Sequence, residues 1–172
     1  MTSTLITERL TLTPVEVSDY DDLLGMWSDP EVIRHIFPEP LNREDVWFRL
    51  LRDIGHWEAL GHGNWTLRLK ETGEHVGSVG VLDYHRVLEP AMDAPELGWG
   101  LRSAFHGKGL AFEALSAALA WCDDALNAAR TVCMIDPTNV PSLALAARGG
   151  YREYARTTYK GSAVILLERL AV

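Results

Sequence analysis

The chain has 172 residues, which is the usual size of one domain, and we expect a single domain over residues 1–172. A chain of this length buries about two-thirds of the surface it exposes when unfolded, so it needs no metal or disulfide to fold. Its 16 lysine and arginine residues stand against 24 aspartate and glutamate residues, a formal net charge of −8. This balance argues against a nucleic-acid partner, which needs a basic face, but it selects no reaction.

The cysteines and the N-terminal residues indicate where the protein resides. Cys122 and Cys133 form no Cys-x-x-Cys pair and have no histidine at metal-ligand spacing. We expect buried free thiols, although a disulfide between the two stays open. The 6 histidines show no zinc spacing, so we predict no metal. Residues 1–10 lack the apolar stretch of a signal peptide, and no apolar run approaches the ~20 residues that span a bilayer. We therefore expect a cytoplasmic protein without a membrane partner.

The N-terminal third predicts one strand followed by helices. Alternating leucines favour a strand over residues 9–13. A helix follows over residues 18–27, with Ser18 as the candidate N-cap and acidic residues near its positive end. A short segment over residues 30–37 ends at prolines. Apolar residues at helical spacing then predict a longer helix over residues 42–60.

The middle of the chain changes from helical spacing to alternation, which is typical of half-buried strands. We expect strands over residues 65–70 and 75–84, joined by a hairpin turn at residues 71–74. A loop over residues 88–95 leads into a further strand over residues 96–101.

The C-terminal part alternates helices and strands. We expect a helix over residues 108–126, a short strand over 131–135, a helix over 141–148, and strands over 151–159 and 163–170. The predicted order is β-α-α-β-β-β-α-β-α-β-β. Its central strand–helix–strand unit implies parallel pairing through a right-handed crossover, and the hairpins imply antiparallel pairing. The expected fold class is α/β, an α+β mixed sheet with helices on both faces.

The segment that follows the strand over residues 96–101 carries the most chemical information. Gly107 and Gly109 flank Lys108 directly before the central helix. Backbone N–H groups at a helix N-terminus bind anions, and glycines let a phosphate approach them. A glycine-rich turn that only begins a helix remains the alternative. A Walker loop would need glycine in place of Arg102, and a dinucleotide fingerprint would need it in place of Ser103, so neither motif is present.

Several short motifs resemble a known family. Residues 106–111 read His-Gly-Lys-Gly-Leu-Ala. Apart from the histidine, this is similar to the Arg/Gln-x-x-Gly-x-Gly/Ala signature of the GNAT superfamily of acyl-CoA-dependent N-acyltransferases. Residues 139–142 (Asn-Val-Pro-Ser) and 148–151 (Arg-Gly-Gly-Tyr), with residues 7–12 and 29–32, resemble its ribosomal-protein N-terminal acetyltransferase branch. The resemblance covers nearly the whole chain and implies the GNAT fold.

The resemblance implies acetyl-CoA as the acyl donor. Its pyrophosphate would lie on the backbone amides of residues 106–111, where the helix dipole favours negative charge. Its pantetheine arm would run beside the strand over residues 96–101, where the neighbouring strand splays away. The expected cofactor-binding residues are Gly100, Leu101, His106, Gly107, Lys108, Gly109, Leu110, Ala111, Asn139 and Ser142.

The resemblance also implies candidates for the chemistry. An amine with a pKa of about 10.4 must lose a proton before it attacks. Glu96 is the candidate base, acting through water; alternatively, it binds the substrate cation or only solvates the surface. Ser142 is the candidate contact for the thiol sulfur, since Ala146 stands where many relatives have a tyrosine; alternatively, it bonds its own helix backbone. Phe37, beside two prolines, is the candidate for the acceptor pocket.

These residues together predict an N-acetyltransferase that moves the acetyl group of acetyl-CoA to a primary amine. The acceptor is a protein N-terminus or a small molecule such as an antibiotic or polyamine. No cysteine lies in a motif that suggests an acyl-enzyme, so we expect direct attack in a ternary complex. The alternative is a non-catalytic acyl-CoA-binding sensor or interaction module of the same fold. Dimerisation is common in the similar branch, so a homodimer is possible.

Overall fold

The computed structural model describes residues 4–171 as a sheet packed between helices. The strands are β1 (Leu5–Ile6), β2 (Leu10–Pro14), β3 (Asn64–Leu69), β4 (His75–Leu82), β5 (Glu96–Leu101), β6 (Arg130–Ile135), β7 (Arg152–Tyr159) and β8 (Ser162–Leu170). The helices are α1 (Tyr20–Trp27), α2 (Pro30–Ile33), α3 (Arg43–Leu60), α4 (Leu110–Asp124) and α5 (Val140–Arg148). The predicted order is found with two short additions, the two-residue strand β1 and the four-residue helix α2, which lies in the segment predicted over residues 30–37.

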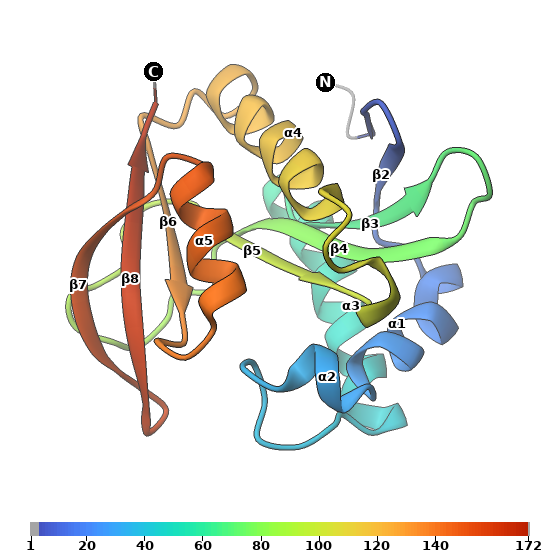
Figure 1. Ribbon diagram of the computed structural model, residues 1–172, viewed down its shortest axis with the longest axis horizontal. Coiled ribbons are helices and arrows are strands. Elements are labelled where there is room, and N and C mark those ends of the chain that lie inside the picture. The colour runs from blue at the N-terminus through green and yellow to red at the C-terminus, as the bar shows by residue number, and fades with distance from the viewer. Residues whose placement is uncertain (1–3, 172) are drawn as a thin grey trace.

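The strands form one mixed sheet in the order β1-β2-β3-β4-β5-β6-β8-β7. Each neighbouring pair is antiparallel except β5 and β6, which are parallel and are joined through α4 (Figure 1). The predicted α/β class with a mixed sheet is therefore confirmed. The single parallel pair lies at the centre of the molecule, where a helix crossover is required to bring the chain back.

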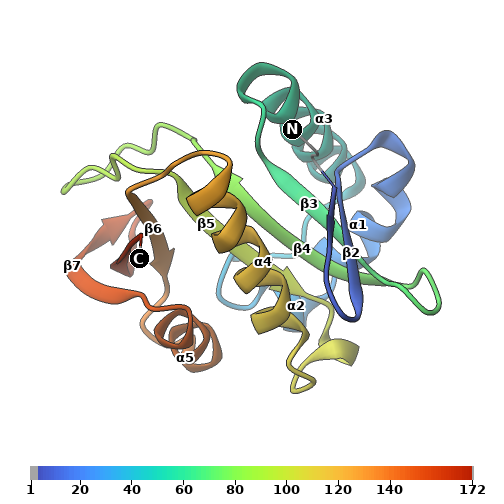
Figure 2. The same cartoon turned by 90° about the horizontal axis from the view of Figure 1, so that it is seen from above.

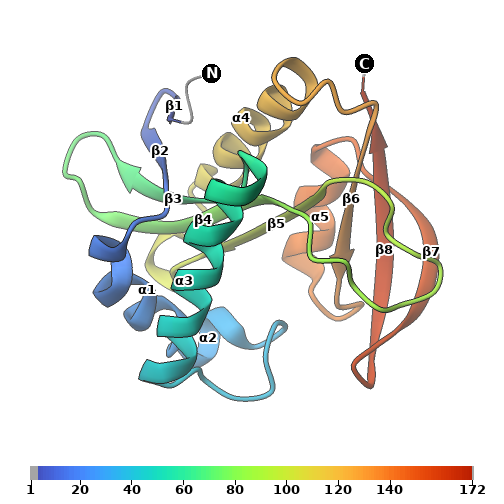
Figure 3. The ribbon, with the colours of Figure 1, turned by 180° about the vertical axis from the view of Figure 1, so that it is seen from behind.

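Helices cover both faces of the sheet. Figures 1 and 3 show α4 and α5 on one face and α1, α2 and α3 on the other. Figure 2, seen from above, shows the sheet between α4 on one side and α1 with α3 on the other. The region between β5 and β6 therefore faces α4 and α5 on one side and α1, α2 and α3 on the other.

The main hydrophobic core fills the space between α4 and the sheet. Its most buried members include Leu115 and Cys122 of α4, both 0% exposed. Trp57, Trp65 and Trp121 pack edge to face around the end of this core, with ring centroids 5.0 to 6.4 Å apart. Cys122 and Cys133 are free and buried, as predicted.

The start of α1 differs from the prediction. Ser18 lies inside a 3₁₀ turn, and its hydroxyl donates to the Glu16 carboxylate at 3.4 Å instead of capping the helix. Asp19 accepts the Glu16 backbone N–H at 2.9 Å and also binds the Arg68 guanidinium at 2.8 Å. Glu16 and Asp19 thus form a capping box at the 3₁₀ turn Val17–Asp19, and α1 itself begins without a side-chain cap.

The ends of α3 agree with the prediction. The Asn42 side chain accepts the backbone N–H groups of Glu44 and Asp45, at 2.9 and 3.0 Å. Gly61 ends the helix with a φ of +73°, a left-handed conformation that glycine adopts without strain. The 18-residue helix thus spans the face of the sheet opposite α4.

Candidate functional site

The parallel strands β5 and β6 separate soon after they meet. In the part of the chain that the structure describes, they pair at one register position, Glu96 opposite Val132. The Val132 backbone N–H donates to the Pro95 carbonyl at 3.0 Å. Beyond that point the middle of β5, residues 98–100, is only partly buried although β5 is an interior strand. The strands therefore leave a gap with backbone groups along its wall.

The backbone hydrogen-bond pattern between β4 and β5 shows which residues of β5 turn their N–H and C=O groups toward this gap. The Arg102 N–H donates to the Val76 carbonyl at 2.9 Å, so Arg102 and, two residues earlier, Gly100 turn their backbone groups toward β4. A Cβ added to Gly77 of β4 would lie 2.3 Å from the Gly100 carbonyl oxygen, which agrees. Trp99 and Leu101 consequently turn their backbone groups toward the gap. Leu101 was among the predicted residues, whereas Trp99 was missed.

The loop between β5 and α4 exposes the N-terminus of that helix. Gly107 and Gly109 adopt left-handed backbone conformations, with φ of +71° and +76°. The first i to i−4 bond of α4 runs from Glu113 N–H to the Gly109 carbonyl at 3.2 Å. The N–H groups of residues 110–112 therefore have no carbonyl partner within the helix and can bind an anion.

His106, the first residue of the predicted pyrophosphate-binding segment 106–111, differs from the residues that follow it. The His106 backbone N–H donates to the Ser103 carbonyl at 3.1 Å, so it is not free for a phosphate. The His106 ring turns back, and its Nε2 lies 2.9 Å from the Leu101 carbonyl oxygen at the end of the gap. The available amides thus belong to the residues after His106.

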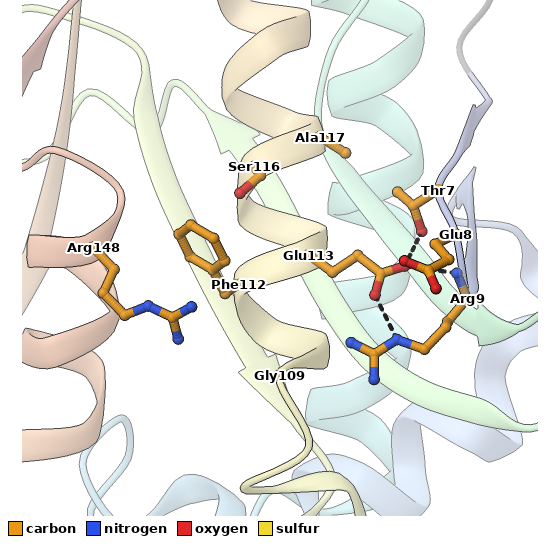
Figure 4. Close-up of a pocket in the computed structure, with 9 residues that line it drawn as sticks. All are labelled: Thr7, Glu8, Arg9, Gly109, Phe112, Glu113, Ser116, Ala117 and Arg148. Carbon is orange, nitrogen blue, oxygen red and sulfur yellow. Dashed lines mark hydrogen bonds and ion pairs between the residues drawn. The ribbon is translucent and has the colours of Figure 1, made fainter.

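The N-terminal segment holds this loop in place. Glu113 of α4 accepts the Arg9 backbone N–H and Nε, both at 2.7 Å, and also the Thr7 hydroxyl (Figure 4). Arg9 Nη1 donates to the Lys108 carbonyl at 2.9 Å. Arg9 therefore adds a second cation beside Lys108, and its role was missed because its partners lie about a hundred residues away in the sequence.

An open groove runs along the outer face of α4 from this point. It encloses about 610 Å³ and is lined by Thr7, Glu8, Arg9, Gly109, Phe112, Glu113, Ser116, Ala117 and Arg148. Figure 4 shows Arg9 and Arg148 on opposite sides of Phe112. The Arg148 guanidinium stacks on the Phe112 ring, 4.0 Å from its centroid. The groove thus offers an aromatic ring and two cations next to the exposed helix N-terminus.

Ser142 and Asn139 meet β5 from the face that carries α5. Asn139 Oδ1 caps α5 by accepting the Ser142 N–H at 3.2 Å. The Ser142 hydroxyl oxygen accepts the Trp99 indole N–H at 3.2 Å. Because that bond uses an acceptor lone pair, the Ser142 proton and the Asn139 amide N–H₂ remain for a ligand.

Glu96 lies on the opposite face of β5, where it is paired with an arginine. Arg86 donates to both Glu96 carboxylate oxygens, at 2.6 and 2.8 Å, and to the Tyr159 hydroxyl at 3.2 Å. The Glu96 side chain is 9% exposed. Burial lowers the pKa of Arg86, but hydrogen bonds and charge attraction to Glu96 outweigh it and hold that pKa above its ordinary value. Sequence reasoning missed Arg86, which lies in the irregular loop after β4.

A smaller cavity lies on the same face as Glu96. It encloses about 300 Å³ and is lined by Phe37, Leu41, Asp45, Phe48, Arg49 and Arg52. Phe37, the residue expected at the acceptor pocket, packs edge to face on Trp27 with centroids 5.9 Å apart. A Cβ on Gly100 would lie 3.5 Å from Trp27 Cη2, so this aromatic pair reaches the middle of β5.

Comparisons with known proteins agree with this arrangement. Residues 9–152 match the family model described as an acetyltransferase (GNAT) domain. The chain belongs to the GNAT acetyltransferase family. A GNAT-family acetyltransferase of Bordetella pertussis is 34% identical, covers 98% of this chain and 99% of its own, and superimposes with a TM-score of 0.86. The uncharacterised N-acetyltransferase p20 of Bacillus licheniformis is 32% identical over 143 residues, 83% of this chain and 78% of the relative.

Membership of the GNAT family establishes this protein as an N-acetyltransferase, and the family uses acetyl-CoA as donor. A ribosomal-protein-serine acetyltransferase of Vibrio cholerae shares the fold, with a TM-score of 0.78 over 99% of this chain and 100% of its own. Its identity of 21% shows the fold alone.

Within residues 4–171, no group of three or more His, Cys, Asp or Glu side chains could hold a metal ion. Over the same residues, no helix has the length and apolar character needed to cross a bilayer.

Proposed function

We propose that this GNAT acetyltransferase transfers the acetyl group of acetyl-CoA to a primary amine by direct attack in a ternary complex. The amine belongs to a protein N-terminus or to a small molecule. The observation that carries the proposal is the gap between β5 and β6. Ser142 meets it from the face of α5, and Glu96 lies on the face of α1 to α3, so donor and acceptor can approach from opposite sides.

The donor side is suited to CoA by its backbone. The free N–H groups of residues 110–112 and the cations Arg9 and Lys108 would hold the pyrophosphate. The gap-facing backbone groups of Trp99 and Leu101 would pair with the amides of the pantetheine arm. Gly100, which we predicted for this role, would act by leaving room for Met26, because a Cβ there would lie 3.0 Å from Met26 Cε. Asn139 and Ser142 would donate to the arm and to the thiol sulfur.

The acceptor side must remove a proton from the amine. Glu96 is the proposed base, acting through water because both of its oxygens already accept hydrogen bonds from Arg86. A backbone N–H in the gap, at Trp99 or Leu101, would stabilise the negative charge that develops on the thioester oxygen. Arg86 would hold the Glu96 carboxylate in a fixed orientation.

The Arg86–Glu96 ion pair is also the observation that favours the second candidate function, a non-catalytic acyl-CoA-binding module. A carboxylate held on both oxygens can serve structure alone. Thiol release from acetyl-CoA, measured against amines and N-terminal peptides, separates the two functions. Release with at least one acceptor supports the enzyme. Thermal stabilisation by CoA without release for any acceptor would support the binding module.

The finer expectations belong to the same proposal. We infer that the protein is one domain over residues 1–172 of the ribosomal-protein N-terminal acetyltransferase branch, on the strength of its motifs at residues 7–12, 29–32, 139–142 and 148–151. Two buried free thiols support a reducing compartment such as the cytoplasm. A homodimer follows from the resemblance to that branch, and light scattering after size-exclusion chromatography would test it.

A further inference from the structure

Arg49 of α3 is a cation without a counter-ion. Its guanidinium carbon lies 4.5 Å from the centroid of Trp27 and 5.3 Å from that of Phe37. Its Nε is shielded from solvent and has no hydrogen-bond partner. Within residues 4–171, Arg49 takes part in no ion pair. The guanidinium therefore stacks on two aromatic rings, and its buried Nε–H has no acceptor.

The carboxylates nearest in the fold are already in use. Asp53 accepts from Arg52 at 2.7 Å and from the Tyr84 hydroxyl at 3.2 Å. Asp45, one turn before Arg49, accepts the Asn42 backbone N–H at the start of α3. Glu96 is occupied by Arg86, as described above. Arg52 and Arg86 thus have carboxylate partners, whereas Arg49 has none within residues 4–171.

An unpaired cation in such surroundings is unfavourable for the fold. Burial lowers the pKa of Arg49, and the charge of Asp53 only partly opposes this. Stacking on aromatic rings offsets part of the desolvation cost, but it does not satisfy the buried Nε–H. A group of this kind is expected where a ligand supplies the missing anion.

Arg49 also lies close to the proposed reaction centre. The Trp27 ring on which it stacks reaches Gly100 in the middle of β5. Arg49 interacts electrostatically with Tyr84 and Arg86, and Arg86 holds Glu96. Arg49 lines the cavity of about 300 Å³ beside Phe37. A ligand group bound in this cavity would be separated from β5, the strand proposed to face the donor, by the Trp27 ring.

We propose that Arg49 binds a carboxylate of the acceptor, so that the amine acetylated by this enzyme belongs to a compound that also carries a carboxylate close to it. The inference rests on the proposed function and specifies its substrate class. A guanidinium binds a carboxylate through two parallel hydrogen bonds, which a neutral amide cannot match. Trp27 and Phe37 would pack on the apolar part of the same molecule. A polyamine is disfavoured, because its second cation would face Arg49.

Matched acceptors test the inference directly. The probes are the twenty common L-amino acids and their primary amides, spermidine, and dipeptide amides with Asp or Asn in second position. Thiol release gives kcat/KM for each probe, and thermal unfolding in the presence of CoA gives binding without turnover. The variants are Arg49→Gln, Arg49→Lys and, as a control with the same charge change, Arg43→Gln. Arg43 is exposed on the same helix. Circular dichroism checks that each variant folds.

For the wild type we expect acids to exceed their amides in kcat/KM by about tenfold or more, chiefly through KM. Arg49→Gln removes this preference, Arg49→Lys retains part of it, and Arg43→Gln leaves it unchanged. Preference for free amino acids or for Asp-containing dipeptides identifies the source of the carboxylate.

Equal use or binding of acids and amides, or a preference that survives Arg49→Gln, overturns the inference. Acetylation of amides or spermidine alone overturns it while upholding the proposed function. Stabilisation by acids without thiol release upholds the carboxylate site and contradicts the proposed function. If neither acids nor amides stabilise the CoA-bound protein or release thiol, the carboxylate site is wrong.

Discussion

At the scale of single residues, the site is built from pairs that lie far apart in the sequence. Trp99 binds Ser142 across the gap, and Arg9 binds both Lys108 and Glu113. Such pairs fix where donors point, so a residue can matter for the reaction without touching the reacting atoms.

Glu96→Gln should lower kcat about a hundredfold, because an amide cannot take a proton from the amine. The affinity for CoA should stay unchanged, since Glu96 lies on the acceptor face. Stopped thiol-release assays and calorimetric titration with CoA measure the two quantities. Glu153→Gln is the matched control, because Glu153 also pairs with an arginine but on the surface strand β7. Turnover unchanged in Glu96→Gln would remove Glu96 from the mechanism.

Neither cysteine should form an acyl-enzyme. Burial raises the pKa of Cys122 to about 12 and raises the pKa of Cys133 as well, so thiolate is scarce near neutral pH. Iodoacetamide at pH 8 should label neither cysteine in the folded protein and both in urea, as seen by mass spectrometry. Loss of activity in step with alkylation of Cys133 would contradict direct transfer.

At the scale of elements, the short loop between β5 and α4 and the packing of α4 decide the donor site. The loop works because two glycines take left-handed conformations and leave the first amides of α4 open. The helix itself is fixed at both ends by arginines from other elements, Arg9 near its start and Arg169 near its end. Changes at either end should therefore have separable effects.

Gly109→Trp should abolish CoA binding. Its φ of +76° disfavours any side chain, and a Cβ there would already lie 3.4 Å from Arg9 Nη2. Gly73→Trp is the control, because Gly73 has a φ of +73° in the β3–β4 turn with open space around it. Both variants carry similar backbone strain, so calorimetry with CoA isolates the effect of the loop. Normal CoA affinity in Gly109→Trp would show that the pyrophosphate lies elsewhere.

The link between α4 and β8 should make stability depend on pH. Two hydrogen bonds from Arg169 lower the pKa of Asp123, against a smaller opposing effect of burial. A lowered pKa means that the folded state binds fewer protons, so the contribution is complete above the unfolded pKa of about 3.9 and is lost as pH falls below it. Asp123→Asn should cost about 1 kcal/mol at pH 7, with solvent screening of a partly exposed pair included.

Urea unfolding of the wild type and Asp123→Asn at a series of pH values measures this contribution. The difference in unfolding free energy should be constant from pH 7 to about pH 5 and should shrink at lower pH. A difference that grows on acidification would contradict the assignment. Arg169 remains present in both proteins, so the comparison isolates the carboxylate.

At the scale of the whole molecule, hydrophobic periodicity and turn residues were enough to predict the order of the longer elements, but not the short strand β1 and helix α2. Asn42 and Gly61 carry local signals for the ends of α3, and these predictions are confirmed. Ser18 does not cap α1, because the chain enters that helix through a 3₁₀ turn whose capping box is formed by Glu16 and Asp19. Fold and family could thus be predicted from the sequence, and so could the ends of α3, whereas the start of α1 could not.

The site was predictable only where a motif fixes the backbone. The glycines around Lys108 indicate a helix N-terminus. The backbone groups of Trp99 face the gap because alternate residues of β5 pair with β4, and the sequence does not show this pairing. The partners of Glu96 and the isolation of Arg49 depend on tertiary contacts between loops and helices. The net charge of −8 does not show where the cations lie, and both cavities described above are lined by arginines.

The central claim is that the protein moves an acetyl group from acetyl-CoA to an amine in one step. Mass spectrometry of protein and acceptor after incubation with acetyl-CoA tests it most directly. The account predicts that an amine acceptor gains one acetyl group for each CoA released, while the protein mass stays unchanged. Acceptors that all remain unmodified while CoA stabilises the fold, or a protein that itself carries the acetyl group on a cysteine, would contradict it.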